Sequence, residues 1–232
     1  MKVVIINYSG NVGKSTISTN LLASRMKSPR KFEVETLNAG GDVEAQKIVG
    51  KRFGDLLDAV MESDDAIVDV GASNVEDFMK LMQQFAGSHL EFDYFVVPVV
   101  KERKQQTDTL STLNSLQHIG IPRDKIRVVF NKIELDDEME KDFAAIYGMH
   151  TAEKNFTLRP KAIIYQNEVY ERLSDAGKSL DEVVSDPTDY RAQLKTLTDE
   201  SLRLDCLQMI AMKRLGVTAT KNLDDAYAAL FA

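Results

Sequence analysis

The residues best suited to do chemistry follow a short apolar run near the N-terminus. Val3 to Ile6 is apolar and β-branched, which predicts a buried strand. Small residues come next and end in Gly13-Lys14-Ser15, and Ile17 to Met26 then has apolar residues at helical spacing. A strand, a glycine-containing turn and a helix N-terminus together direct backbone N–H groups at one point, which suits an anion. The sequence therefore predicts a phosphate-binding loop at residues 9–16.

The side chains of this loop have distinct expected roles. Lys14 is expected to contact the β- and γ-phosphate oxygens as a point charge, and the Ser15 hydroxyl to bind Mg²⁺. Gly10 and Gly13 are expected because a Cβ would crowd the phosphates or forbid a positive φ. The full nucleotide-binding set is predicted to be Gly10, Asn11, Val12, Gly13, Lys14, Ser15, Thr16 and Asn131.

The loop matches only the second half of the pattern Gly-x-x-x-x-Gly-Lys-[Ser/Thr], because Tyr8 stands at the first glycine. An ordinary surface turn is the alternative interpretation.

Polar residues also follow three later strand-like runs. Asp69 lies near the end of an apolar run. In P-loop proteins an aspartate at this place lies beside the phosphate loop and holds Mg²⁺, usually through water. The alternative is that Asp69 caps the helix that follows. Asn131 could present a donor and an acceptor to a purine edge, or simply end a strand. Asp42, in the turn at 38–42, is the candidate for orienting the attacking water, with a plain turn aspartate or helix cap equally open. Lys14, Asp42 and Asp69 are the predicted catalytic residues.

Strand-like and helical patterns alternate from residue 3 to about 165. This alternation predicts an α/β fold, a three-layer doubly wound and mainly parallel sheet, with every strand ending at the edge where ligands bind. Residues 1–184 are expected to form the nucleotide-binding domain, and residues 185–232 a C-terminal helical extension packed on it. Residues 43–60 are expected to be mostly helical, and the extension is expected to hold a long helical stretch at 190–215 and a shorter one at 223–231.

Composition narrows the class of protein. The 232 residues are 44% hydrophobic and 28% charged, which is ordinary for a soluble domain. No run approaches the roughly 18 apolar residues that span a bilayer, and the single cysteine, Cys206, excludes an intrachain disulfide, so we expect a cytoplasmic protein without membrane partners. The net charge of −7 argues against DNA binding by the whole surface. A local basic patch at 101–104 and 123–127 is more often a solvated face than a DNA contact.

Ser9 to Thr16 resembles the deviant Walker A loop of the ParA/MinD superfamily, whose form is Lys-Gly-Gly-x-Gly-Lys-[Ser/Thr]-[Ser/Thr]. The resemblance extends over residues 1–184 and includes Asp69-Val70-Gly71 and Asn131. Within the superfamily, the opening residues look most like StbB-type plasmid stability proteins. The resemblance implies ATP and Mg²⁺ as cofactors, a homodimer, and a plasmid-encoded partner protein.

Two departures from the family pattern bear on mechanism. Ser9 replaces the signature lysine, which in the family reaches the nucleotide of the second subunit in an ATP-sandwiched dimer; Asn11 replaces the second glycine. Asn38 stands where the family has an aspartate that positions water, unless Asp42 serves. We therefore expect slow hydrolysis, or binding without efficient turnover.

The predicted function is a nucleotide-dependent plasmid stability or partition protein of ParA/MinD type. A non-hydrolysing nucleotide-binding interaction module and a P-loop small-molecule kinase or synthetase are the alternatives. ATP is preferred to GTP, because Glu134 stands where the Asn-Lys-x-Asp element of GTPases has its aspartate.

Overall fold

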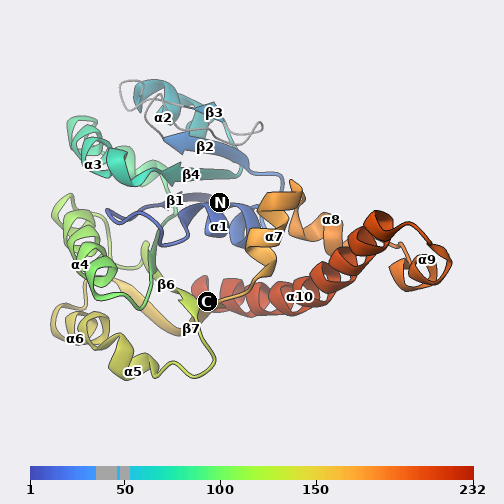
Figure 1. Ribbon diagram of the computed structural model, residues 1–232. Helices are drawn as coiled ribbons and strands as arrows, with labels where there is room; N and C mark the ends of the chain where they lie inside the picture. Colours follow the sequence, from blue (N-terminus) through green and yellow to red (C-terminus); the bar gives the residue numbers. More distant parts are fainter. Residues whose placement is uncertain (35–45, 48–52) are drawn as a thin grey trace.

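The computed structural model describes residues 1–34, 46–47 and 53–232. The described residues form a parallel sheet of seven strands in the order β3-β2-β4-β1-β5-β6-β7 (Figure 1). The strands are β1 (Lys2–Ile5), β2 (Arg30–Val34), β3 (Gln46–Lys47), β4 (Ala66–Val70), β5 (Tyr94–Val99), β6 (Ile126–Ile133) and β7 (Thr157–Tyr165). This confirms the expected doubly wound α/β fold.

Helices cover both faces of the sheet. One face carries α2 (Phe53–Met61), η3 (Ala72–Asn74), α3 (Val75–Gln84), η4 (Ser88–Glu91), α4 (Arg103–His118), α5 (Met139–Asp142) and α6 (Ala144–Glu153). The other carries α1 (Lys14–Thr16), the π-helix η1 (Ile17–Ala23), α7 (Val169–Ala176), α8 (Leu180–Ser185) and α10 (Glu200–Leu230), with α9 (Tyr190–Thr196) packed on α10. None of the described helices combines the length and the apolar character that crossing a membrane requires.

The central strand β1 explains why the N-terminal run is apolar throughout. Val4 contributes to the core on one face of the sheet, while Val3 and Ile5 contribute to the core on the other, and all three are fully buried. Side chains alternate along a strand, so a strand covered on both faces needs apolar residues at every position. β1 also lies between β4 and β5, where the strand order reverses direction, which is the place where open α/β sheets bind ligands.

Two expectations along the chain were wrong in detail. Residues 46–47 pair with β2 as a short parallel strand rather than joining a helix, and the helix of this region begins only at Phe53. In the C-terminal part, the stretch predicted at 190–215 is divided between α9 and the start of α10, and α10, a helix of 31 residues, runs through the predicted break between 215 and 223.

Tertiary packing maintains that long helix through residues of low helix propensity. Ala219 and Leu223 are buried in the core between α10 and the sheet, and Arg25 donates to the Thr220 carbonyl at 3.1 Å and pairs with Asp224 at 2.7 Å. A helix boundary does occur earlier, where the Asp199 side chain accepts from the Leu202 N–H at 3.0 Å and caps α10.

Helix α10 also protects the edge strand β7. Asn222 donates to the Ile163 carbonyl at 2.9 Å and accepts from the Tyr165 N–H at 2.9 Å, so one carboxamide pairs with the backbone as a neighbouring strand would. Unpaired strand edges invite association with other chains, and this contact removes part of that edge.

Gly216 is the point of closest approach between α10 and α8. An added Cβ would lie 2.9 Å from Val184 Cγ2 and 3.3 Å from Leu180 Cδ1. We expect Gly216→Val to lower the free energy of unfolding by about 1–3 kcal/mol, because it overpacks this contact. At Gly148, in helix α6, a Cβ meets nothing within 4 Å, so Gly148→Val should change stability by less than about 0.5 kcal/mol. Chemical denaturation measures both, and equal effects would contradict the packing argument.

Candidate functional site

The loop between β1 and α1 has the backbone shape of a phosphate cradle. Asn11 has φ 58° and Gly13 has φ 83°, so both lie in the left-handed region. Asparagine is among the few residues that tolerate this region, which explains how Asn11 can stand where the family pattern has glycine. Gly10 has no positive φ, so the argument from φ was wrong for this residue, and its closeness to a bound phosphate stays a prediction.

The N–H groups of the cradle are available to an anion. Among the described residues, no acceptor receives a hydrogen bond from the backbone N–H groups of residues 10–13. Buried or crowded N–H groups ordinarily find a partner. Four N–H groups on a left-handed turn at a helix start are the donors that a chain of phosphates accepts from.

Lys14 is held inside the loop. Its side chain is nearly buried, at 9% exposed, and its ammonium donates to the carbonyls of Ser9 at 2.9 Å and Asn7 at 3.4 Å. Burial lowers the pKa of Lys14 below its ordinary value, and the nearby Asp69 carboxylate opposes this in part. A buried cation with incomplete compensation is stabilised by an added anion, so the loop suits phosphate electrostatically.

Asn131 supports the loop from the neighbouring part of the sheet. It lies within β6, is 3% exposed, and its amide donates to the Val12 carbonyl at 2.8 Å. A Cβ on Gly13 would lie 2.0 Å from the same amide nitrogen, so this side chain occupies the space that Gly13 leaves. Gly13 is thus required both by its positive φ and by Asn131.

Lys132 is a further support that the sequence reasoning did not select. Its φ of 56° turns the chain within β6, and its ammonium donates to the Asn11 carbonyl at 3.0 Å and to Asn11 Oδ1 at 3.1 Å. Adjacent residues of β6 thus hold adjacent residues of the loop. In the sequence, Asn131 and Lys132 are similar to the start of the Asn-Lys-x-Asp element of GTPases. That similarity concerns recognition of the base and does not predict a contact with the loop.

The start of the loop is attached to helix α4, which the sequence reasoning also missed. The buried Asn7 amide donates to Thr109 Oγ1 at 2.8 Å and to the Pro98 carbonyl at 2.8 Å. The Tyr8 N–H donates to Thr112 Oγ1 at 3.0 Å, and the Tyr8 hydroxyl to Ser115 Oγ at 3.1 Å.

The signal for this contact was the spacing of the hydroxyl residues. Thr109, Thr112 and Ser115 recur every three residues on α4, which places them on one helix face.

The two predicted Mg²⁺ ligands lie at the same edge of the sheet. Asp69 is largely buried near the end of β4, paired in register with Ile5 of β1, and acts electrostatically on Lys14. Ser15 is exposed on α1. Oxygen ligands of this kind suit Mg²⁺, and the arrangement is compatible with a metal held between the loop and β4. Asp42 lies outside the described residues, as does the turn at 38–42.

A cavity of about 640 Å³ lies between the helical segment that follows the loop and the helices α7 and α8. Ser15 and Thr16 line it at one end, and Tyr170, Lys178 and Glu182 line it on the side of α7 and α8. Burial raises the pKa of Tyr170 to about 12, so its phenol stays neutral at physiological pH.

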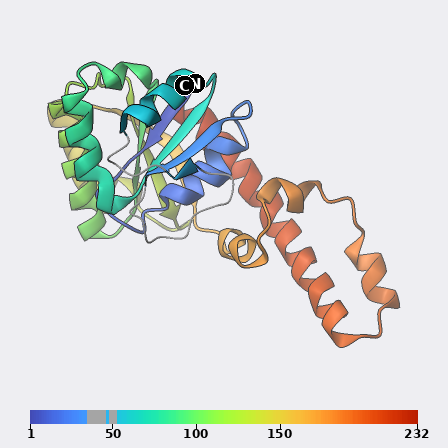
Figure 2. The ribbon, with the colours of Figure 1, turned by 90° about the horizontal axis from the view of Figure 1, so that it is seen from above.

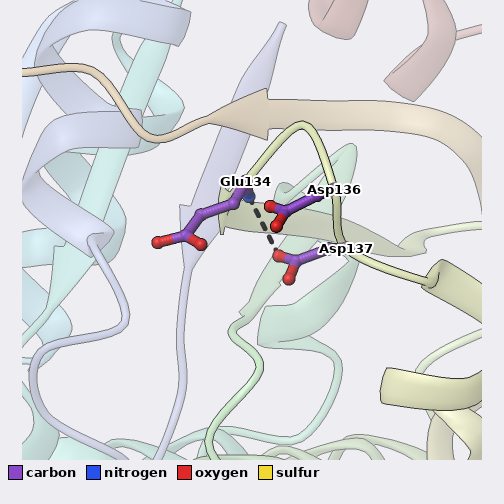
Figure 3. Close-up of side chains that lie close together, drawn as sticks. All are labelled: Glu134, Asp136 and Asp137. Atoms are coloured by element: carbon purple, nitrogen blue, oxygen red, sulfur yellow. Dashed lines mark hydrogen bonds between the residues drawn. The ribbon is translucent and has the colours of Figure 1, made fainter.

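The acidic residues after β6 stabilise their own loop. Glu134, Asp136 and Asp137 lie close together there (Figure 3). Asp137 accepts from the Glu134 N–H at 2.9 Å and pairs with Lys101, which also lies 3.7 Å from Asp142. Burial alone would raise the pKa of Asp137, but these donors bring it below its ordinary value. Lys101 follows β5, whereas Asp137 and Asp142 follow β6. These ion pairs therefore join the segments that follow the two strands.

The suggested basic patch does not form one surface. Lys101 follows β5 at the carboxyl edge of the sheet, whereas Lys125 and Arg127 lie at the start of β6, at the opposite edge. Lys125 donates to the Phe92 carbonyl at 2.7 Å, and Arg127 is largely buried over the Tyr94 ring. These residues therefore have structural contacts and do not provide a continuous site for DNA phosphates.

Several solved structures have a similar fold. They include a ParA family ATPase from Chlorobium tepidum TLS (14% identity, TM-score 0.56, covering 80% of this chain and 92% of that one) and apo McdA of Cyanothece (16%, 0.51, 78% and 92%). MinD from Aquifex aeolicus is a third (14%, 0.51, 92% and 96%). No family model and no curated protein matches the sequence. The structural likenesses show that this chain shares the α/β fold of these proteins.

Two roles for Asn131 can be separated by comparing ligands with and without a base. If Asn131 positions the loop, Asn131→Ala should weaken binding of ATP and of inorganic tripolyphosphate by the same factor, about 5–30-fold for a lost buried hydrogen bond. If it reads the base, only ATP binding should weaken. Isothermal titration calorimetry with both ligands decides between them. Asn155→Ala, another buried asparagine that donates to Gln117, controls for general destabilisation.

Proposed function

We propose that this chain binds ATP with Mg²⁺ at residues 10–16 and hydrolyses it slowly. The observation that carries the proposal is the buried Lys14 ammonium inside a loop whose N–H groups are free of acceptors among the described residues. The ParA/MinD fold supports the same function, since the Chlorobium tepidum relative in structure is an ATPase. The site lies at the carboxyl edge of a parallel sheet, where the strand order reverses.

The residues of this chain have the following proposed roles. The N–H groups of residues 10–13 donate to the phosphate oxygens, and Lys14 exchanges its carbonyl partners for β- and γ-phosphate oxygens. Ser15 and Asp69 hold Mg²⁺, which supplies charge neutralisation on the phosphates. Asn131 and Lys132 hold the loop in its binding shape, so that little ordering is needed when nucleotide arrives. The cavity beyond Ser15 and Thr16 offers room for the nucleoside.

Slow turnover is proposed because of Ser9. The Ser9 backbone carbonyl is a partner of Lys14, and the residue is largely buried, with its N–H bonded to Asn7 Oδ1 at 2.7 Å. A serine cannot supply the cation that the ParA/MinD pattern has at this position, and a missing cationic contact in phosphoryl transfer costs several kcal/mol. The same observation favours a second candidate, a nucleotide-binding interaction module without hydrolysis.

The proposed biological role is plasmid stability or partition of the StbB type. It rests on the resemblance of the loop residues together with the ParA/MinD fold. In this proposal the protein is cytoplasmic, nucleotide controls its association into homodimers, and a plasmid-encoded protein is the partner.

Nucleotide binding can be tested with two lysine variants. Lys14→Ala should weaken ATP–Mg²⁺ binding at least about tenfold, because a charge-assisted contact to phosphate is lost. Lys104→Ala removes an exposed lysine on α4 and should bind ATP like the wild type. Calorimetric titration measures both affinities. An unchanged affinity in Lys14→Ala would refute the phosphate-binding loop.

Hydrolysis requires its own measurement. Wild-type turnover should be slow but faster than uncatalysed hydrolysis, as measured by phosphate release. Tight ATP binding with turnover at the uncatalysed rate would refute the ATPase and leave the binding module. Ser9→Lys should raise turnover with a dependence on protein concentration, because the restored lysine acts across two subunits.

A further inference from the structure

Three exposed leucines lie on a helical arm, far along the chain from the proposed nucleotide site. The arm consists of α9 and residues 200–211 of α10, and it projects from the rest of the molecule (Figures 1 and 2). Its base is fixed, since Lys213 donates to the carbonyls of Asp186 and Thr188 and lies over the Tyr190 ring. The arm is therefore an ordered part of the structure that is held away from the body.

One face of the arm helix is used within the chain. Cys206 and Met209 are buried, and Cys206 contacts Gln193 of α9. Arg203 closes the end of α9 by donating to the carbonyls of Leu194 and Leu197 at 2.8 and 2.9 Å. These contacts account for the apolar residues on this side of α10.

The opposite face of the arm helix is apolar and uncovered by any described segment. Leu204 is 56% exposed and Leu207 is 49% exposed, and Ala211 follows at the next position on the same face. Exposed large apolar side chains that are contiguous mark an interaction surface. We call Glu200, Leu204, Leu207, Ala211, Arg214 and Thr218 the seam; they recur at intervals of four and three residues and fall within roughly 80° of the helix circumference.

The charges at the two ends of the seam indicate what covers it. Glu200 and Arg214 are exposed, and neither takes part in an ion pair among the described residues. If two seams packed in parallel, each charge would face its own copy, which is repulsive. If they packed antiparallel about Leu207, so that Leu207 faces its own copy and Leu204 lies against Ala211, Glu200 of each copy would lie beside Arg214 of the other.

We infer that the seam is a self-association surface, on which two copies of this chain pair their α10 helices antiparallel. Leu207 lies at the centre, Leu204 of each copy packs beside Ala211 of the other, and two Glu200–Arg214 ion pairs close the ends. Such a contact is isologous, since each copy offers the same surface, so the seam by itself joins two copies and no more. The seam is separate from the nucleotide loop, so this association does not depend on the proposed function.

The test is the oligomeric state of the full chain without nucleotide, measured by sedimentation over a range of concentrations. The wild type should be in monomer–dimer equilibrium. Glu200→Arg and Arg214→Glu should each raise the dimer dissociation constant about tenfold, because each places like charges together. The double variant should return it to within about threefold of the wild-type value, because the pairs are restored in reverse.

Leucine variants supply a matched control. Leu207→Asp should raise the dissociation constant at least about thirtyfold, because it puts charge at the centre of the seam. Leu202→Asp alters an equally exposed leucine, 51% exposed, on the other side of the helix, and should leave the dimer intact. ATP affinity should be unchanged in all these variants, which separates this result from the nucleotide proposal.

A wild-type chain that stays monomeric at every soluble concentration would overturn the inference and leave the seam to a different protein. Failure of the double charge variant to recover association would also overturn it, as would equal losses from Leu202→Asp and Leu207→Asp.

Discussion

The loop between β1 and α1, which we propose binds phosphate, depends on being held from outside. Its own residues form no regular structure, and two of them, Asn11 and Gly13, have left-handed φ angles that cost backbone freedom. The bond from Asn131 to the Val12 carbonyl, 2.8 Å long and buried, opposes this cost where the chain turns most sharply. A buried polar group that loses its hydrogen bond costs free energy. This contact therefore favours the one arrangement in which Val12 and Gly13 of the loop lie against Asn131 of β6.

The remaining contacts of the loop extend the same constraint across the sheet. Lys132 holds Asn11, the α4 hydroxyls hold Asn7 and Tyr8, and Lys14 occupies the space in between. Each support comes from an element that follows β1 by about a hundred residues. The sheet order makes this possible, because β5 and β6 follow β1 in the sheet and α4 joins them. A loop prepared in this way needs little reorganisation to accept phosphate, and this lowers the cost of binding.

The nucleotide loop and the arm divide the molecule into two surfaces with different chemistry. The loop offers N–H groups and a cation for an anionic ligand, and its specificity comes from charge and backbone shape. The seam offers leucines bounded by opposite charges, and its specificity comes from the direction in which two helices can pair. Helix α10 connects the arm to the body of the molecule. Its first half presents the seam, and its second half packs in the core beside β7 (Figure 2).

The sequence by itself determined the strands other than β3, their parallel arrangement and the position of the loop, because a strand buried on both faces must be apolar throughout and a cradle needs small residues before Lys14. It also placed Asp69 and Asn131 at the correct edge. The break between α9 and α10 and the continuity of α10 through residues 216–222 were decided by the tertiary structure. Propensity there is weak, and packing of Ala219 and Leu223 determines the result.

Only the tertiary structure decided which polar side chains support the loop. Asn7, Tyr8 and Lys132 are ordinary in sequence, and their roles arise because distant elements meet at one edge of the sheet. The seam is similar, because Leu202 and Leu204 look alike in the sequence. Packing of α9 on one side of α10 leaves the face of Leu204 and Leu207 exposed, and burial, unlike periodicity, is a property of the whole fold.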